Sequence, residues 1–196
     1  MNGTLEAPKL AGWLDGLGGN SPRETRWLTP GWIVEALGHF DLDPAGAPGH
    51  WLADRTYTPE AGEDGLTLPW EGRVWLNPPY GREQIPFMKR MADHNHGTAL
   101  LFAAVETKLW HEHIWPRASA ILFPLGRFTF ARADGVVAKA NSGKPSALIA
   151  YGPSDAIALE HCGIDGQLIH LGTNRPEVRA SGWTAGTASA DSEESR

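Results

Sequence analysis

Four consecutive residues carry groups that can activate an amino group for attack on an electrophile: Asn77, Pro78, Pro79 and Tyr80. The amino group of a nucleic-acid base is a poor nucleophile, because its lone pair is delocalised into the ring. The side-chain oxygen of Asn77 and the carbonyl oxygen of Pro78 can accept its two hydrogens and draw the nitrogen toward a tetrahedral shape. The prolines stiffen the turn and preorganise both acceptors, and the ring of Tyr80 can stack on an extruded base.

A rigid Pro-Pro turn capped by asparagine is the structural alternative for this tetrad, since short motifs of this kind also occur in ordinary loops. The position of the tetrad in the chain favours a functional site. Residues 73–76 are typical of a short strand that ends directly before Asn77, and ligands of open α/β sheets bind at the carboxyl ends of strands. The chemistry requires alignment and electrostatics, but neither a metal nor a covalent intermediate.

The elements around the tetrad predict an α/β fold. Strand patterns alternate with helix patterns, which indicates a sheet with helices on both faces. We expect strands at residues 39–42, 73–76, 98–105 and 120–123, and helices at 83–94 and 107–117. Residues 27–30 are expected to open a further helix, with Thr29 as its N-cap and Pro30 at its first position. Residues 127–130 and 146–151 are expected to form a closing antiparallel pair.

The composition is that of a globular protein with one core. Of the 196 residues, 41% are apolar and 20% are charged, which excludes a disordered chain. We expect a flexible arm at residues 1–22, a catalytic domain at 23–175 and a disordered tail at 176–196. No apolar run is long enough for a bilayer and no secretory signal is present, so a cytoplasmic protein without membrane contact is expected.

The sequence also predicts that no metal is bound. The single cysteine, Cys162, excludes an internal disulfide and argues against a cysteine-ligated metal site. Four histidines between residues 94 and 113 have a spacing that matches no ligand pattern: His94, His96, His111 and His113.

The formal net charge of -6 does not by itself indicate a nucleic-acid-binding protein. Part of the acidic charge, however, falls in the tail. Four basic residues gather in a stretch with few acids and can form a local patch: Arg127, Arg132, Lys139 and Lys144. An ordinary solvated hairpin is the alternative interpretation of this stretch.

The chain between residues 27 and 151 resembles the phage-type DNA N6-adenine methyltransferase family, the Dam-like enzymes of bacteriophages and prophages. The matching pieces come in order: residues 27–30 (WLTP), 40–45 (FDLDPA), 57–59 (YTP), 64–66 (DGL), 74–80 (VWLNPPY), 107–111 (TKLWH) and 126–130 (GRFTF). The resemblance implies a Rossmann-like S-adenosylmethionine-dependent methyltransferase fold with a mixed sheet. It also implies S-adenosyl-L-methionine as the methyl donor, adenine N6 in double-stranded DNA as the acceptor, and a place of action in the bacterial host cell.

The resemblance further assigns a cofactor loop to the residues after the first strand: Asp43, Pro44, Ala45 and Gly46. Small residues there would let the backbone approach the ligand. For Asp43, a cap on its own turn is an equally simple role.

Three more residues are assigned to the cofactor by the resemblance alone. Asp64 matches the acidic position that accepts a hydrogen bond from the cofactor's adenine amino group, although an Asp-Gly turn is its alternative role. Thr29 and Pro30 resemble the segment that contacts the methionine end. No single residue stands out as the ribose ligand, for which Glu60 and Asp54 are both candidates.

Other functions remain open at the level of sequence. The same tetrad serves enzymes that methylate cytosine N4, an RNA base or a protein glutamine amide. Enzymes that act on RNA bases or glutamine usually carry a plainer glycine-rich cofactor loop than this chain has. A catalytically decayed nucleic-acid-binding module is a further alternative, against which the intact Asn77 argues.

Overall fold

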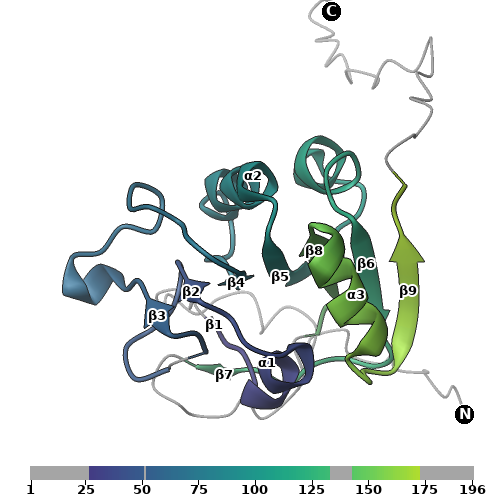
Figure 1. Cartoon of the computed structure of the whole chain (residues 1–196), viewed down its shortest axis with the longest axis horizontal. Helices are drawn as coiled ribbons and strands as arrows, with labels where there is room; N and C mark the ends of the chain where they lie inside the picture. The colour runs from purple at the N-terminus through teal and green to yellow at the C-terminus, as the bar shows by residue number, and fades with distance from the viewer. Residues whose placement is uncertain (1–26, 51, 133–142, 173–196) are drawn as a thin grey trace, which may run out of the picture.

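The structure, a computed structural model, describes residues 27–50, 52–132 and 143–172 (Figure 1). Its helices are α1 (Gly31–Leu37), α2 (Gln84–His94) and α3 (Pro153–His161), with a short 3-10 helix η2 (Pro59–Ala61) and a π-helix η3 (Trp110–Ile114). Its strands are β1 (Trp27–Leu28), β2 (Leu42–Asp43), β3 (Arg55–Thr56), β4 (Val74–Leu76), β5 (Gly97–Phe102), β6 (Ala120–Pro124), β7 (Ala131–Arg132), β8 (Ser146–Tyr151) and β9 (Gly166–His170).

Seven of these strands form one mixed sheet in the order β3-β2-β4-β5-β8-β6-β9. The pairs β3-β2, β2-β4 and β4-β5 are parallel, whereas β8 is antiparallel to both β5 and β6. β8 is therefore inserted between two strands that precede it in the chain. Every residue of β8 is buried, as expected for a central strand that is covered on both faces.

Helices cover both faces of this sheet (Figure 1). On one face, Met88 of α2 and Ile114 of η3 are fully buried in one hydrophobic cluster. On the other face, Ile33 of α1 and Leu159 of α3 belong to a second cluster. Successive residues of β5 alternate between the two clusters, because side chains of a strand point to opposite faces in turn.

The strands next to the predicted site end at one edge of the sheet. β2, β4 and β5 are parallel, and β6 has the direction of β5 because both are antiparallel to β8. The segments that follow Asp43, Leu76 and Phe102 therefore leave the sheet at the same edge, which is called the carboxyl edge below. This is the edge at which open α/β sheets bind ligands.

A buried ion pair fastens the opposite end of β4 to the helices. Nε of Arg73 donates to Oδ1 of Asp155 at 2.8 Å, and the Asp155 side chain is completely buried. The same guanidinium donates to the carbonyl oxygens of Leu37 and His39, and the hydroxyl of Thr98 also donates to Asp155. One arginine thus connects β4, β5, α3 and the end of α1.

The predicted α/β sheet with helices on both faces is confirmed. The strand predicted at 73–76 corresponds to β4, the helix at 83–94 to α2, the apolar run at 98–105 to β5 and the strand at 120–123 to β6. The strand predicted at 39–42 is β2, which lies slightly later in the chain. The helix predicted at 107–117 is partly a π-helix.

One predicted strand pairing and one predicted helix start are wrong. Residues 127–130 do not pair with 146–151, because the fully buried 146–151 segment takes the centre of the sheet as β8. Instead, Phe128 and Phe130 are buried in the cluster around α1, and the chain continues into β7. Residues 27–28 do not open a helix but form β1, which pairs antiparallel with β7 in a separate two-stranded sheet.

The predicted arm at 1–22 and the predicted tail at 176–196 lie outside the described residues. Within the described ranges, none of the helices has the length and apolar character needed to cross a bilayer.

Candidate active site

Asn77 stands at the carboxyl edge, directly after β4. All three residues of β4 are fully buried, which fixes the point at which the tetrad leaves the sheet. The side-chain nitrogen Nδ2 of Asn77 donates to Oγ1 of Thr29 at 3.1 Å. The carbonyl oxygen Oδ1 is therefore the end of the amide that is turned away from Thr29.

Thr29 is itself held from two sides. It is almost completely buried, at 2% exposure, and it follows β1, whose Leu28 pairs with Ala131 of β7. Its carbonyl oxygen lies 3.0 Å from Nε2 of His50. Because a carbonyl oxygen only accepts, Nε2 must carry the hydrogen of this bond. Burial lowers the pKa of His50, which keeps the ring neutral near pH 7.

The predicted capping role of Thr29 is wrong. α1 begins at Gly31, the N-cap position belongs to Pro30, and no side chain caps this helix. The Thr29 hydroxyl accepts from Asn77 instead, because β1 carries it to the end of β4. The predicted contact of Thr29 and Pro30 with a cofactor remains a prediction.

Tyr80 closes the tetrad against the end of β5. Its ring stacks on Phe102, with centroids 4.5 Å apart and planes inclined by 16°. Phe102 therefore covers one face of the ring that was predicted to stack on a base. The Tyr80 hydroxyl is buried without a hydrogen-bond partner among the described residues, and burial raises the pKa of this phenol.

The predicted cofactor loop begins with a buried carboxyl group. Asp43 is 3% exposed, and its Oδ1 accepts from the backbone nitrogen of Ala45 at 3.0 Å. It thus caps its own turn, as the alternative interpretation had it. Burial raises the pKa of Asp43 from 3.8 to about 7. At Gly46 a Cβ would overlap Cγ2 of Thr56 and lie 3.1 Å from Oδ2 of Asp43, so the loop fits only a glycine there.

A pocket of about 410 Å³ brings this loop together with the tetrad and with Asp64. Its walls come from the loop, the 59–66 segment and the start of α2, and from the predicted set it includes Pro44, Ala45, Gly46, Asp64 and Pro79. Oδ1 of Asp64 accepts from the backbone nitrogen of Leu66 at 2.9 Å, so the predicted Asp-Gly turn is also present.

A second, small pocket of about 20 Å³ shares Ala45 and Gly46 with the first. It is lined by three further predicted residues, Thr29, Asp43 and Asn77, and by His50. The structure therefore gathers most of the predicted residues around two adjoining cavities at the carboxyl edge. Pro30, Pro78 and Tyr80 line neither of them.

Several residues of this region were not found by sequence reasoning: His50, Glu63, Phe87 and Phe102. Phe102 had a usable signal, because it ends the strand next to β4. His50 had none, since a lone histidine in a loop has no spacing to compare. The large pocket is lined by Glu63, Asp64 and Glu83, whereas the two ribose candidates, Glu60 and Asp54, do not line it.

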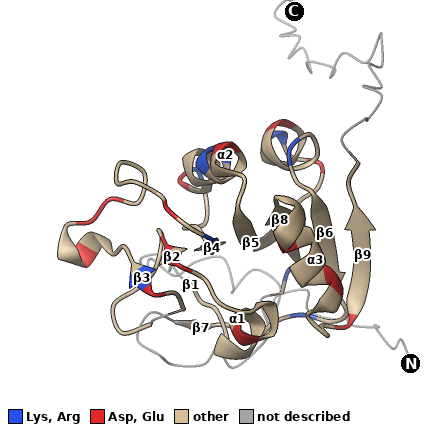
Figure 2. Ribbon diagram, viewed as in Figure 1, with Lys and Arg blue, Asp and Glu red and all other residues tan. Residues whose placement is uncertain are grey.

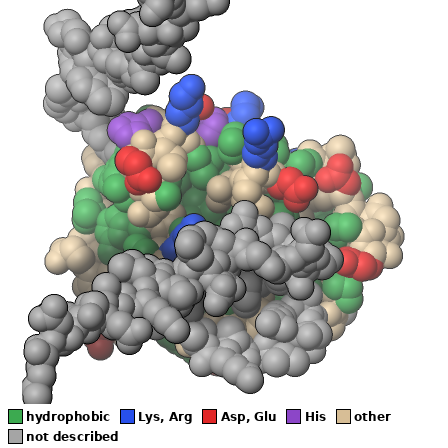
Figure 3. All heavy atoms as spheres, turned by 180° about the vertical axis from the view of Figure 1, so that it is seen from behind, with side chains coloured by type: hydrophobic (Ala, Val, Ile, Leu, Met, Phe, Trp, Pro, Cys, Tyr) green, Lys and Arg blue, Asp and Glu red, His purple; other side chains and the backbone are tan. Residues whose placement is uncertain are grey.

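The charged side chains are dispersed over the surface. Figure 2 shows basic and acidic residues interspersed on the same helices and loops. Seen from behind, Lys, Arg and His side chains lie along the upper side, where α2 and η3 are found (Figure 3). Of the predicted basic patch, Arg127 and Lys144 are exposed, while Lys139 and the side chain of Arg132 are outside the described residues.

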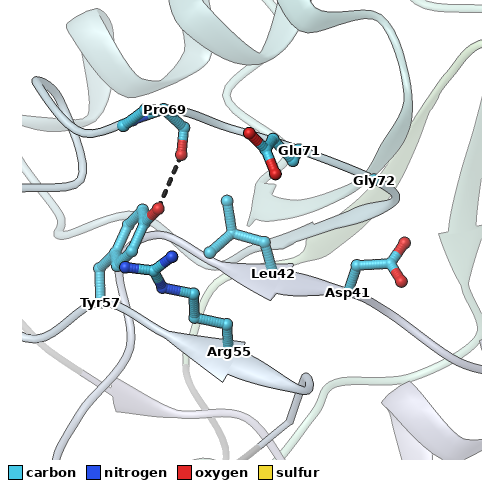
Figure 4. A pocket seen from close by; sticks show the side chains of 7 residues that line it. All are labelled: Asp41, Leu42, Arg55, Tyr57, Pro69, Glu71 and Gly72. Carbon is cyan, nitrogen blue, oxygen red and sulfur yellow. Dashed lines mark hydrogen bonds between the residues drawn. The ribbon is translucent and has the colours of Figure 1, made fainter.

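A pocket of about 350 Å³ opens at the opposite end of β2 (Figure 4). Two of its polar side chains already have hydrogen-bond partners: the Tyr57 hydroxyl donates to the Pro69 carbonyl at 2.7 Å, and Asp41 accepts from the backbone nitrogen of Arg73. None of the residues predicted for catalysis or cofactor binding lines this pocket.

One group of side chains in the described ranges has ligand atoms close enough together for a metal: His39, Asp41 and Asp54. All three are exposed, and Nε2 of His39 already lies 3.0 Å from Asp54. The histidines weighed in the sequence do not belong to it, and His94 instead contacts the Gly72 carbonyl. This group offers no coordination geometry that distinguishes it from an ordinary exposed ion pair.

Comparisons with known proteins point to one kind of protein. The family model described as DNA N-6-adenine-methyltransferase (Dam) matches residues 19–158. A protein of Escherichia phage T1 named DNA N-6-adenine-methyltransferase is 30% identical over 118 residues, which are 54% of this chain and 48% of that protein. The chain thus spans about half the length of the curated relative it matches.

Proposed function

The chain belongs to the DNA N-6-adenine-methyltransferase (Dam) family, and from this premise we propose that it transfers a methyl group to the N6 amino group of adenine in DNA. The observation that carries the proposal is the Asn77 amide, which is anchored through its nitrogen and lines the small cavity that adjoins the large one through Ala45 and Gly46. An anchored amide next to a cofactor-sized pocket is the arrangement that amino-group methylation requires.

S-adenosyl-L-methionine is the methyl donor in this proposal. The large pocket, at about 410 Å³, is within the range of about 300–1,000 Å³ typical of small-molecule sites. Its apolar residues, Pro44, Leu66 and Phe87, suit the faces of an adenine ring, and the Asp64 carboxylate suits its amino group. The residues present therefore fit this cofactor. When bound, it supplies a sulfonium methyl that is already activated for transfer.

The chain's own residues act on the acceptor. In the proposal, Oδ1 of Asn77 and the carbonyl oxygen of Pro78 accept the two hydrogens of the N6 amino group. This draws the lone pair out of conjugation, so that the nitrogen can take the methyl group and lose one proton to water. Tyr80 stacks on the extruded adenine with the face that Phe102 leaves uncovered.

Double-stranded DNA is the proposed partner, and the phage T1 relative supports a phage or prophage setting inside a bacterial host cell. The family and the relative both carry DNA in their names, which supports DNA over RNA or protein as the substrate.

The proposal is tested by incubating the purified protein with S-adenosyl-L-methionine and unmethylated bacterial genomic DNA. Mass analysis of the nucleosides should find N6-methyladenine. N4-methylcytosine in its place, or methylation only of RNA or of protein glutamine, would overturn the choice of substrate. Absence of any methyl transfer together with retained DNA binding would instead favour a binding module.

A further inference from the structure

We propose that Thr29 is a positioning residue, whose hydroxyl holds the Asn77 amide by its nitrogen so that the carbonyl oxygen faces the substrate amino group. The inference rests on the proposed function for the identity of the reaction. It assigns to the Thr29 hydroxyl a role in orienting a catalytic group, which is distinct from the contact with a cofactor that the family resemblance implies.

The two ends of an asparagine amide have nearly the same shape but opposite hydrogen-bonding character. Only the oxygen end can accept a hydrogen from an amino group. If the amide were rotated by about 180°, its own N–H groups would face those of the substrate amino group. In the structure Nδ2 of Asn77 donates to Oγ1 of Thr29 at 3.1 Å, which places Oδ1 at the end of the amide that does not face Thr29.

The anchor is rigid because Thr29 has little freedom of its own. The residue is 2% exposed, its carbonyl oxygen accepts from Nε2 of His50 at 3.0 Å, and Leu28 before it is paired with Ala131. β1 and β7 are not part of the main sheet, so they bring Thr29 to Asn77 from outside it. His50, Thr29 and Asn77 therefore form one hydrogen-bonded chain at the edge of the site.

A second buried threonine makes it possible to separate the effect of the hydrogen bond of Thr29 from the effect of its packing. Thr56 is a matched residue in β3: it is 8% exposed, and its Oγ1 is buried without a hydrogen-bond partner among the described residues. Replacing either threonine by valine keeps the shape and removes the hydroxyl. Only Thr29→Val removes a bond to Asn77.

The test compares Thr29→Val, Thr29→Ser and Thr56→Val in the full chain, with unmethylated bacterial DNA and S-adenosyl-L-methionine. We expect Thr29→Val to lower kcat by about tenfold, the order that the loss of one hydrogen bond supplies. The dissociation constant of the cofactor should change less than about threefold, because the change acts on kcat rather than on binding. Thr29→Ser should restore most of kcat, and Thr56→Val should keep it unchanged.

A kcat of Thr29→Val equal to that of the unchanged protein would overturn the inference. So would a loss in Thr29→Val that is matched by an equal loss in Thr29→Ser, because the serine keeps the hydroxyl. Thermal unfolding of each variant identifies a loss that arises from misfolding alone, and such a loss would also count against the positioning role.

A second measurement does not depend on activity. In nuclear magnetic resonance spectra of the unchanged protein, the side-chain amide protons of Asn77, assigned by their loss in Asn77→Asp, should exchange with water more slowly than those of the exposed Asn95. In Thr29→Val this protection should disappear. Equal exchange at Asn77 and Asn95 contradicts the anchor, whereas protection at Asn77 without any methyl transfer would contradict the proposed function and leave the anchor standing.

Discussion

At Asn77 the proposed chemistry depends on a single acceptor atom. Asn77→Ala removes this acceptor but leaves the walls of the 410 Å³ pocket in place, since Asn77 does not line it. We expect methyl transfer to fall by about a hundredfold or more, by analogy with the loss of one preorganised hydrogen-bonding group in other enzymes. Cofactor binding should persist, as measured by calorimetric titration. Equal loss of binding and transfer would indicate a structural role.

Asp43 should make the folded protein less stable as the pH rises. Its pKa rises from 3.8 to about 7 on folding, because burial disfavours the charged form. The folded state therefore keeps a proton that the unfolded state releases. The free energy of unfolding consequently falls as the pH rises from about 4 to about 7. Between the two pKa values the fall is about 1.4 kcal/mol per pH unit.

The measurement is denaturant unfolding of the ligand-free protein and of Asp43→Asn between about pH 4.5 and about pH 7.5. The amide of the variant can still accept from Ala45 but does not titrate, so its unfolding free energy should fall less steeply with pH. Parallel pH profiles of the two proteins would show that Asp43 does not titrate in this window.

Single residues were predictable where their chemistry is local. Asn77 was singled out because an amide directly follows a strand pattern, whereas the cofactor role of the loop from Asp43 to Gly46 was implied by the family resemblance. The hydrogen bonds that Asn77 and His50 donate to Thr29 were not predictable. They join residues far apart in the chain, and the sequence does not indicate which group a hydroxyl or an imidazole will bond to.

Among the elements, the loop from Asp43 to Gly46 has little room for a larger side chain at Gly46. Gly46→Ala would place a Cβ against Cγ2 of Thr56 and close to the Asp43 carboxylate. We expect a loss of about 1–3 kcal/mol in unfolding free energy, as for other overpacked sites, and weaker cofactor binding. Thr56→Ser removes the methyl group that the new Cβ would overlap. Combined with Gly46→Ala, it should restore part of the unfolding free energy and part of the cofactor affinity.

Gly31→Ala is the control for this prediction. A Cβ at Gly31 meets only a carboxylate oxygen of Glu35, at 3.8 Å, which is an ordinary contact. Its unfolding free energy and cofactor affinity should match those of the unchanged protein. If Thr56→Ser gives no recovery to Gly46→Ala, the strain lies elsewhere in the loop.

Helices and strands were easier to predict where their apolar sequence pattern was longer. α2, β5 and β6 have apolar periods or runs that are long enough to identify, and the structure confirms them. β1 and β7 have two residues each, which is too short for any period, and their pairing arises from tertiary packing. The segment 146–151 was identified as a strand, but its partners were not, because an apolar run does not specify which neighbours bury it.

At the scale of the whole molecule, the ion pair between Arg73 and Asp155 connects α1 and α3 to the sheet. Asp155→Ala leaves a largely buried guanidinium without its charged partner, for which a loss of about 3–5 kcal/mol is typical. Methyl transfer well below the unfolding temperature should persist, because the pair is at the end of β4 opposite Asn77.

Glu160→Ala on the same helix is the matched control. Glu160 faces His170 across 3.8 Å with both side chains about half exposed, and such a pair contributes at most about 1 kcal/mol. Thermal and denaturant unfolding of the two variants should therefore differ clearly. Similar losses for both would mean that Asp155 is not a connecting residue.

The place of β8 in the sheet has a consequence for how the ribosome produces this protein. β6 is synthesised before β8, yet its strand partners in the described part of the chain are only β8 and β9. A nascent chain therefore carries β6 as an unpaired apolar strand, a target for chaperones and proteases, until residue 151 has left the exit tunnel. Ribosome-bound chains that stop before Ser146 should be cut by protease near β6, and chains with a linker long enough for residue 172 to leave the exit tunnel should resist. Equal protease resistance of the shorter and longer chains would mean that β6 is protected before β8 is synthesised. Resistance of the longer chains alone would mean that the methyltransferase fold is completed only when synthesis of the domain is nearly finished.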